Sequence, residues 1–402
     1  KDTLKNLGLW RTVRIGWSYV WTRLFPIARE HSLEDFFINR FGRELYRTFF
    51  KSYTEKVWGV PCHDISAAWG AQRIKGLSVS KTLLNALMRP FRQKGDVRQK
   101  HVETSLIEEF LYPKYGPGQM WEVCGQKVRE MGGEIRCNMQ VTTLSVEGNA
   151  ITGLTACSSV DDHEETFSGD YFFSTMPIKD LVRALKTPVP TPIREISEGL
   201  MYRDFITVGL LVNALKIAEH TAAGRQLVKD NWIYIQEPEV RVGRLQIFNN
   251  WSPYMVADPE KVWIGLEYFC FEGDDLWSLD DETMARLAIA ELASIEIIDT
   301  SEVLDHTVIR VPKTYPAYFG TYTRFEELRI WLDGFENLLL IGRNGMHRYN
   351  NQDHSMLTAM TAVDNIIAGI KDKTNLWEIN TEQEYHEEKE DARPQQPDET
   401  RS

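Results

Sequence analysis

The segment between Asn337 and Ile370 constrains the fold of this 402-residue chain more than any other stretch. It begins with an apolar run that predicts a short buried strand, continues with the mostly polar or small residues Gly342–Asn351, and ends in a predicted helix, Asp353–Ile370. The apolar residues of this helix recur at intervals of four and three, so one face is expected to be buried: Met356, Met360, Val363, Ile367 and Ile370.

A helix that starts beside the end of a strand presents unpaired N–H groups and a partial positive charge at that end. Such a helix N-terminus binds anions, and it also stabilises negative charge that develops on an electron-accepting ring. The run Gly342–Asn351 is longer than a plain connection between a strand and a helix requires. We therefore predict a ligand site here, and a simple strand–turn–helix crossover is the alternative.

Charge and cysteine content exclude several kinds of protein. The formal net charge is −12 and no basic stripe is present, which argues against a nucleic-acid or anionic-membrane partner. The five cysteines are scattered without CxxC spacing, so we expect no metal site and no disulfide framework, and we place the protein in the reducing cytoplasm. No apolar run of about 18 residues predicts a membrane span. The amphipathic stretch Trp17–Pro26 is too short to cross a bilayer, although it could touch a membrane surface.

Local patterns predict helices first and strands later. The apolar spacing of Ser32–Phe50 predicts a helix capped by Ser32, and a second helix is expected at Ser66–Leu87. After a turn-rich loop, a helix at Trp121–Met131 precedes a predicted hairpin of Glu134–Val146 and Ala150–Cys157, and strand signals between Met201 and Pro316 predict an antiparallel sheet. In that sheet Glu267 alternates with apolar neighbours, so it is a candidate to face a cavity.

Four motifs, in this order, resemble the flavin amine oxidase and protoporphyrinogen oxidase-like superfamily, which includes UDP-galactopyranose mutases. They are Tyr53–Gly59, the Tyr-Pro loop Tyr112–Met120, the strand Phe173–Pro177, and the closing Gly-Arg segment at Gly342. The closing segment keeps Gly342, Arg343, Arg348, Tyr349 and Asp353 of the mutase pattern. It has His347, Asn351 and Gln352 where that pattern has Tyr, Asp and Met.

The resemblance implies FAD as cofactor and a small-molecule substrate. It implies cofactor contacts from Val141, Thr175, Met176, Gly342, Arg343, Asn350, Asn351, Asp353, His354, Ser355 and Met356. It implies a substrate pocket lined by Tyr53, Trp58, Tyr315 and Tyr318, with core packing as the alternative for these aromatic residues. His347, Tyr349 and Arg343 are the catalytic candidates: His347 for proton exchange, Tyr349 for contact with a ligand, and Arg343 for a phosphate or carboxylate. For Arg343, an ion pair that holds the turn is the alternative.

The implied fold class is α/β, with a discontinuous FAD-binding domain and an inserted antiparallel-sheet substrate domain carrying helical excursions. We expect residues 1–110 to form the helical part of the substrate domain and 111–180 a segment of the FAD domain. Residues 181–330 would form the antiparallel substrate domain, and 331–370 the closing strand and helix of the FAD domain. Residues 371–402 form an acidic tail that we predict to be disordered.

A Gly-x-Gly-x-x-Gly motif, which a dinucleotide fold uses to approach the pyrophosphate, does not occur in this sequence. In the superfamily that unit would precede Lys1 by roughly a hundred residues, and Lys1 is not an initiator Met, so we expect a fragment or processed product whose FAD domain lacks its first βαβ unit. Three functions stay open: an FAD-dependent oxidoreductase that moves hydride from substrate to flavin, a mutase-like flavin isomerase of a nucleotide sugar, and a cofactor-free structural or binding module. The sequence does not specify the oligomeric state.

Overall fold

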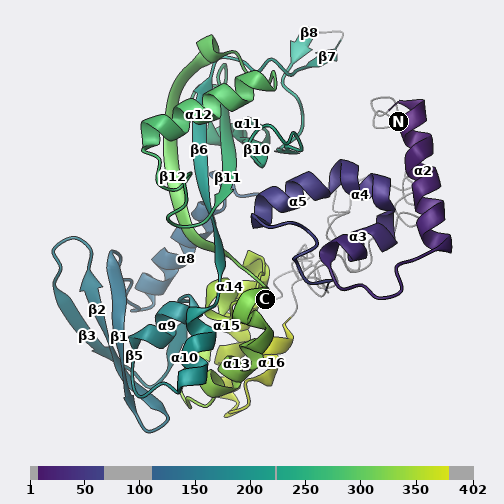
Figure 1. Ribbon diagram of the computed structural model, residues 1–402. Coiled ribbons are helices and arrows are strands. Elements are labelled where there is room, and N and C mark those ends of the chain that lie inside the picture. The colour runs from purple at the N-terminus through teal and green to yellow at the C-terminus, as the bar shows by residue number, and fades with distance from the viewer. Residues whose placement is uncertain (1–7, 68–110, 222–223, 380–402) are drawn as a thin grey trace, which may run out of the picture.

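The computed structural model describes residues 8–67, 111–221 and 224–379, and these residues form the mixed α/β architecture expected from the sequence. Figure 1 shows four groups of elements: a five-stranded sheet at the top, helices α2–α5 at the right, a four-stranded sheet at the lower left, and the helices α9, α10 and α13–α16 at the bottom. Most of the predicted helix Ser66–Leu87 and the tail beyond Ile379 lie outside the described residues.

The helical group comprises α2 (Leu9–Leu24), α3 (Leu33–Phe41), α4 (Arg43–Phe49) and α5 (Lys51–Trp58). Ser32 caps α3 as predicted: its hydroxyl accepts from the N–H of Asp35, whose carboxylate accepts from the N–H of Ser32. The single predicted helix Ser32–Phe50 is wrong, because the chain breaks at Gly42 with a φ of 80°. Buried aromatic and aliphatic side chains of α3, α4 and α5 form one core cluster with Tyr315.

The five-stranded sheet is antiparallel in the order β12-β6-β11-β10-β9. Its strands are β6 (Tyr202–Val212), β9 (Trp232–Tyr234), β10 (Arg244–Ile247), β11 (Val262–Cys270) and β12 (Val303–Pro316). One face carries apolar residues such as Leu245 and Leu266, which pack in one core with helix α12 (Asp281–Ser294). The other face carries Arg244, Gln246 and Glu267 and is not covered by α12. We call it the Arg244 face; Arg244 and Glu267 are buried on it.

Short elements surround this sheet. They are β7 (Glu219–Thr221), β8 (Gly224–Gln226), α11 (Phe248–Trp251), and the 3-10 turns Pro253–Met255, Thr300–Glu302 and Gly320–Arg324. Helix α5 is attached to the sheet through cations: Lys56 Nζ donates to three carbonyls of the segment between Ile235 and Val242, and Arg203 Nε donates to the carbonyl of Val57 at 2.8 Å. These bonds hold the helical group against the sheet edge.

The four-stranded sheet has the order β3-β2-β1-β5 and follows helix α8 (Gly118–Glu130). Its strands are β1 (Met139–Glu147), β2 (Ala150–Ser158), β3 (Glu164–Ser168) and β5 (Leu185–Lys186). The hairpin β1–β2 is the one that the alternation predicts, although its first strand begins at Met139 rather than Glu134. Helix α9 (Ile178–Ala184) packs on this sheet, and α10 (Thr191–Glu198) packs on α9.

Two strands that are far apart in the chain pair in parallel: β4 (Phe172–Ser174) and β13 (Leu338–Leu340). The helices that follow or flank them are α13 (Phe325–Asp333), α14 (Gly342–Gly345), α15 (Gln352–Ile367) and α16 (Thr374–Glu378). The polar run after β13 therefore contains a helical turn, α14, before the predicted long helix begins. The carboxyl ends of β4 and β13 lie side by side because the two strands pair in parallel, and Gly342, which follows β13, lies close to Ser355 in the first turn of α15.

The predicted buried face of α15 is wrong. Met360, Val363, Ile367 and Ile370 are exposed, and Met356 is half-buried. The buried face consists instead of His354, Thr358, Ala362 and Asn365. Polar residues are buried here because they have hydrogen-bonding partners: Thr358 Oγ1 accepts from the N–H of Gly342 at 3.1 Å, and Asn365 exchanges amide bonds with Asn375 near α16.

The start of the predicted disordered tail is also different in the structure. Helix α16 packs Leu376 into the core beside β13, and Lys373 Nζ donates to the carbonyls of Asp333, Phe335 and Leu338. Charge composition alone does not reveal this, since one buried leucine and one lysine with three carbonyl partners are enough to hold a short helix.

We predict that Gly42→Ala destabilises the protein by about 2 kcal/mol more than Gly148→Ala. Both glycines have positive φ, 80° and 59°, so alanine is strained at either position. A Cβ at Gly42 would also lie 2.9 Å from the backbone Cα and N of Tyr19, whereas a Cβ at Gly148 meets nothing within 4 Å. Urea unfolding of both variants measures the difference, and equal losses would show that the α2–α4 contact tolerates the methyl group.

Candidate cofactor and substrate site

The carboxyl ends of β4 and β13 bring together residues that the sequence predicted to contact a cofactor. A Cβ added to Gly342 would lie 3.8 Å from Thr175 Cγ2 and 3.9 Å from Ser355 Oγ, so the three residues surround one small space. Gly345 lies even closer to β4, because an added Cβ would be 2.2 Å from the carbonyl oxygen of Ser174. Glycine is therefore required at 345, where the loop lies directly on the end of β4.

The first turn of α15 faces this space. Asn351 is the N-cap, is exposed and makes no side-chain cap bond. Asn350 is buried, and its Oδ1 accepts from Ser355 Oγ at 2.9 Å, while Asp353 Oδ1 contacts His354 Nδ1 at 2.9 Å. The side chain of Asn351 makes no cap bond, and the N-terminal end of a helix attracts an anion or a polar edge of a ring.

Arg343 holds the loop together. Its Nε and Nη2 donate to the carbonyl of Asn350 at 3.1 and 2.7 Å, and Nη1 donates to the carbonyl of Thr314 at 3.1 Å. Its guanidinium carbon also lies 4.6 Å from the centre of the Tyr349 ring. The structure thus assigns the fork of Arg343 to backbone carbonyls, which agrees with the turn-holding role rather than with a free phosphate ligand.

His347 is fully buried rather than placed in an open site. Its ring lies 4.8 Å from Tyr202 and 5.8 Å from Tyr322, centre to centre, and its Nε2 contacts the carbonyl of Ala317 at 3.1 Å. Burial lowers the pKa of His347 to about 4, so the imidazole is neutral near pH 7. An imidazole inside an aromatic core cannot reach a substrate, so we do not propose His347 for proton transfer.

Tyr349 connects the loop to the five-stranded sheet. Its ring stacks on Tyr315 with a centroid distance of 5.7 Å and an interplanar angle of 14°, and its N–H donates to Tyr318 Oη at 2.5 Å. Tyr315 Oη in turn accepts from Arg244 Nη2 at 2.8 Å. Tyr318, Tyr349 and Tyr315 therefore form one chain of contacts that leads from the loop to Arg244 on the Arg244 face of the sheet.

The Arg244 face of the sheet carries a buried ion pair. Arg244 and Glu267 are cross-strand partners in β10 and β11; their side chains form an ion pair, and Gln246 Nε2 donates to Glu267 Oε1 at 2.7 Å. Burial acts to lower the pKa of Arg244, but Tyr315 and Glu267 raise it above its ordinary value, so the guanidinium stays charged. Arg244 also lies 4.8 Å from the centre of the Trp232 ring.

Arg244, Gln246 and Trp232 are site residues that the sequence reasoning missed. A sequence signal exists for Arg244 and Gln246. They alternate with the apolar residues Leu245 and Ile247, which is the pattern of a strand with one polar and one apolar face. Glu267 lies on the Arg244 face but is buried, so the expectation that it faces a cavity stays a prediction. Tyr53 joins the same surface, since its ring packs edge-on against Tyr234 at 4.8 Å.

The remaining predicted residues are farther from this loop or deeper in the core. Trp58 is buried among the helices and packs against Phe319, so core packing is the better description. Met176 follows β4, and its N–H donates to Ser174 Oγ at 3.3 Å. Met356 lies half-buried in the second turn of α15. Val141 lies in β1 of the four-stranded sheet, next to the hairpin partner Ala156.

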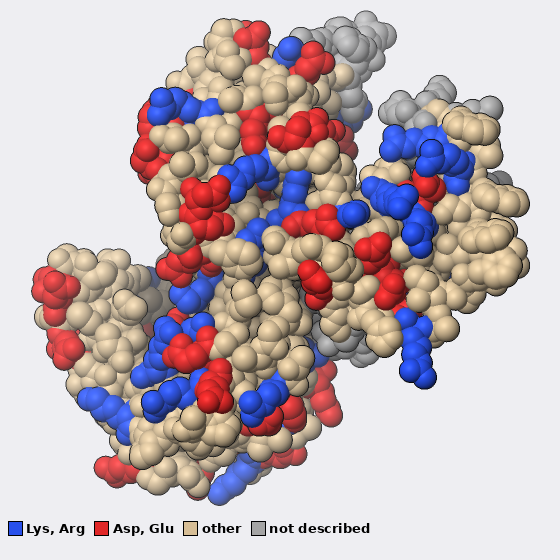
Figure 2. Space-filling model, in the orientation of Figure 1, with Lys and Arg blue, Asp and Glu red and all other residues tan. Residues whose placement is uncertain are grey.

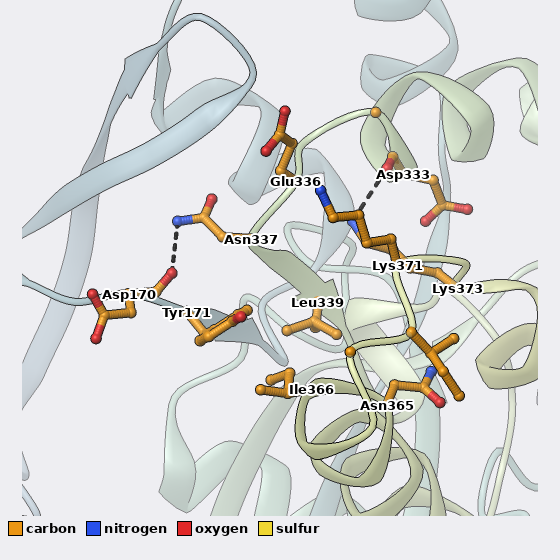
Figure 3. A pocket seen from close by; sticks show the side chains of 13 residues that line it. Asp170, Tyr171, Asp333, Glu336, Asn337, Leu339, Asn365, Ile366, Lys371 and Lys373 are labelled. Carbon is orange, nitrogen blue, oxygen red and sulfur yellow. Dashed lines mark hydrogen bonds between the residues drawn. The ribbon is translucent and has the colours of Figure 1, made fainter.

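A cavity of about 650 Å³ lies at the opposite, amino ends of β4 and β13 (Figure 3). Asp170 and Tyr171 precede β4, Asn337 precedes β13, and Lys371 and Lys373 follow α15. The residues predicted to bind the cofactor or substrate are not among those that line it. We therefore keep this cavity apart from the candidate site.

We predict that the free energy of unfolding decreases as the pH falls from about 6.5 to about 4, in part because of His347. Its pKa is 6.5 in the unfolded chain and about 4 in the folded protein, so the unfolded state binds the proton first. The effect can reach about 3 kcal/mol at pH 4. His347→Gln keeps a donor toward Ala317 and should flatten the pH dependence measured by urea unfolding, whereas exposed His63→Gln should not. A slope unchanged in His347→Gln would refute the assignment.

No family model matches the chain, but solved structures share its fold. A reduced UDP-galactopyranose mutase aligns with a TM-score of 0.70 and 19% identity over 93% of this chain and 77% of its own. A protoporphyrinogen oxidase-like protein from Exiguobacterium sp. 255-15 aligns at 0.55 and 15% over 84% and 68%. A putrescine oxidase bound to putrescine aligns at 0.51 and 16% over 89% and 72%. The chain thus has the fold of the proteins that its sequence motifs resemble.

Proposed function

We propose that this chain is part of an FAD-dependent oxidoreductase acting on a small organic substrate. The observation that carries the proposal is the joint end of β4 and β13, where two closely approached glycines and the N-terminus of α15 lie together. Flavin, when bound there, would accept hydride from the substrate. The fold shared with a mutase and with a putrescine oxidase supports this reading.

The residues present fit the flavin end of such a cofactor. Gly342 leaves the loop without a side chain next to Thr175, so a flat ring can approach the backbone there, while Gly345 lets the loop lie directly on the end of β4. The first turn of α15, from Asn351 to Ser355, would stabilise negative charge on the ring edge. Asn350 and Arg343 would keep this loop rigid through their hydrogen bonds, and Met176 and Val141 would contact other parts of the cofactor.

The substrate would lie between the loop Gly342–Asn351 and the Arg244 face of the sheet. Tyr349 and Tyr315 form a stacked aromatic wall on the loop side, and Tyr53 and Trp232 provide aromatic surface on the sheet side. The charged pair Arg244–Glu267 supplies both a cation and an anion at the floor. Such a floor suits a substrate with a polar or ionised group, and Tyr318 supports the wall by accepting from the N–H of Tyr349.

This proposal divides the chain as the sequence motifs imply. The FAD-binding domain would be discontinuous, made from residues 111–180 and 331–370, and the substrate domain would be made from 1–110 and 181–330. The parallel pairing of β4 with β13 supports the division, because it joins the two FAD-domain segments across the whole antiparallel sheet.

A mutase-like isomerisation of a nucleotide sugar is the second candidate. One specific observation favours it. The segment Tyr53–Gly59, which resembles a segment of the mutases, forms most of α5 and its C-cap, and the ring of Tyr53 packs against Tyr234 and Phe269 on the Arg244 face of the sheet. The TM-score of 0.70 to a UDP-galactopyranose mutase agrees with this. The residues Asn351 and Gln352, which replace Asp and Met of the mutase motif, favour the oxidoreductase instead.

We predict that the purified chain takes up FAD and that Gly345→Ala weakens this uptake at least about tenfold, because its Cβ would push the loop off the end of β4. Gly16→Ala is the matched control, since a Cβ there meets nothing within 4 Å. FAD titration followed by gel filtration and visible absorption measures the uptake. A folded chain that stays colourless with excess FAD would contradict the proposal and would support a cofactor-free binding module.

We further predict that a substrate reduces the bound flavin without added reductant. The visible absorption of oxidised FAD should be lost anaerobically with one member of a panel of amines and other small oxidisable compounds. Glu267→Gln removes the carboxylate from the floor and should slow this reduction, while free FAD uptake stays unchanged. Turnover of UDP-galactopyranose by prereduced protein, with no reduction by the panel, would favour the mutase.

A further inference from the structure

Helix α2 turns its apolar side chains toward solvent. Trp10, Trp17 and Trp21 are 79, 70 and 55% exposed. Val13, Val20 and Leu24, together with Phe25 at the helix end, are exposed as well. At helical spacing these residues share one side of the helix, because they lie three or four positions apart. We call this surface the α2 apolar face.

The opposite side of α2 is polar and packs against the protein. Ser18 Oγ accepts from the N–H of Glu44 at 3.1 Å, and Thr22 is buried with its hydroxyl bonded to the carbonyl of Ser18. Tyr19 lies against Gly42 at backbone distance. A helix that packs on its own domain normally does so through apolar residues. In α2 the polar side packs against the protein and the apolar side faces solvent. The α2 apolar face is therefore available to contact an apolar surface outside the chain.

Basic residues outnumber acidic residues around this face. Helix α2 contains Arg11, Arg14 and Arg23 and no acidic residue. Arg14 pairs with Glu44 of α4 at 2.6 Å, whereas Arg11 and Arg23 are exposed. Between residues 8 and 58 nine Lys and Arg residues stand against five Asp and Glu residues, although the whole chain has a net charge of −12. Figure 2 shows uncharged surface along the right edge of the molecule, where α2 lies, with basic and some acidic side chains beside it. The face is therefore apolar in its centre and positive at its margins.

We propose that α2 docks this protein in the plane of an anionic phospholipid surface. Tryptophan and phenylalanine side chains prefer the interface between headgroups and acyl chains, and flanking arginines extend to lipid phosphates. A second copy of the chain fits less well as the partner. A symmetric pairing of two α2 helices would bring their arginines together, and α2 has no acidic residue to form ion pairs with them. None of the described helices is long and apolar enough to cross a bilayer, so the contact is peripheral.

The test uses flotation of the full chain with vesicles of phosphatidylcholine, with and without about 30% phosphatidylglycerol. The chain should float with the anionic vesicles, and less with the neutral ones or at high salt. Trp10→Ser/Trp17→Ser/Trp21→Ser should reduce the bound fraction at least about tenfold. The matched control Trp121→Ser/Met131→Ser/Val160→Ser removes three exposed apolar side chains elsewhere and should bind as the unmodified chain does.

A second variant separates lipid binding from loss of folding. Arg11→Glu/Arg23→Glu keeps the α2 apolar face and should selectively lose binding to anionic vesicles, while circular dichroism and urea unfolding stay unchanged. The proposal is overturned if the unmodified chain does not float, if the tryptophan variant floats equally well, or if the matched control loses as much. It is also overturned if sedimentation shows a dimer that the tryptophan substitutions dissociate and vesicles bind neither form.

Discussion

The candidate site depends on the parallel pairing of β4 with β13, and the side chain of Asn337 fixes that pairing. Its Oδ1 accepts from the N–H of Ile151, and its Nδ2 donates to the carbonyls of Ile151 and Asp170. One amide, directly before β13, thus bonds to β2 and to Asp170, two positions before β4. Parallel strands need a long connection, and here that connection contains the whole antiparallel sheet. The pairing of β4 with β13 therefore fixes the position of the loop after β13 relative to the Arg244 face of the sheet.

Sequence reasoning identified the strands and the ligand loop because these depend on local signals. Alternation marks β6, β10 and β11, and the polar run after β13 is too long for a plain turn. It placed the wrong face of α15 in the core, since apolar spacing does not show which polar residues find partners. Thr358 and Asn365 are buried because Gly342 and Asn375 bond to them, and such partners become visible only in the folded chain.

The roles of individual site residues were the hardest to predict. Arg343 and His347 have side chains suited to catalysis, yet one is occupied by the carbonyls of Asn350 and Thr314 and the other is enclosed by aromatic rings. Their neighbours come from β12 and from the turn that follows it, about thirty residues upstream. Conversely, Arg244 and Glu267 gain their importance from direct cross-strand pairing, and a register between two strands is not encoded in either strand alone.

Two features of the structure oppose stability and so point to function. A buried ion pair such as Arg244–Glu267 is often no more stabilising than apolar residues of the same volume, because both charges lose water. An exposed row of tryptophans on α2 likewise leaves large apolar area in water. The first feature lies on the Arg244 face of the sheet, in contact with the Tyr315–Tyr349 stack, and the second lies on a helix with exposed arginines. A polar substrate would offset the first and an anionic lipid surface the second, since each supplies the contacts that the isolated chain lacks.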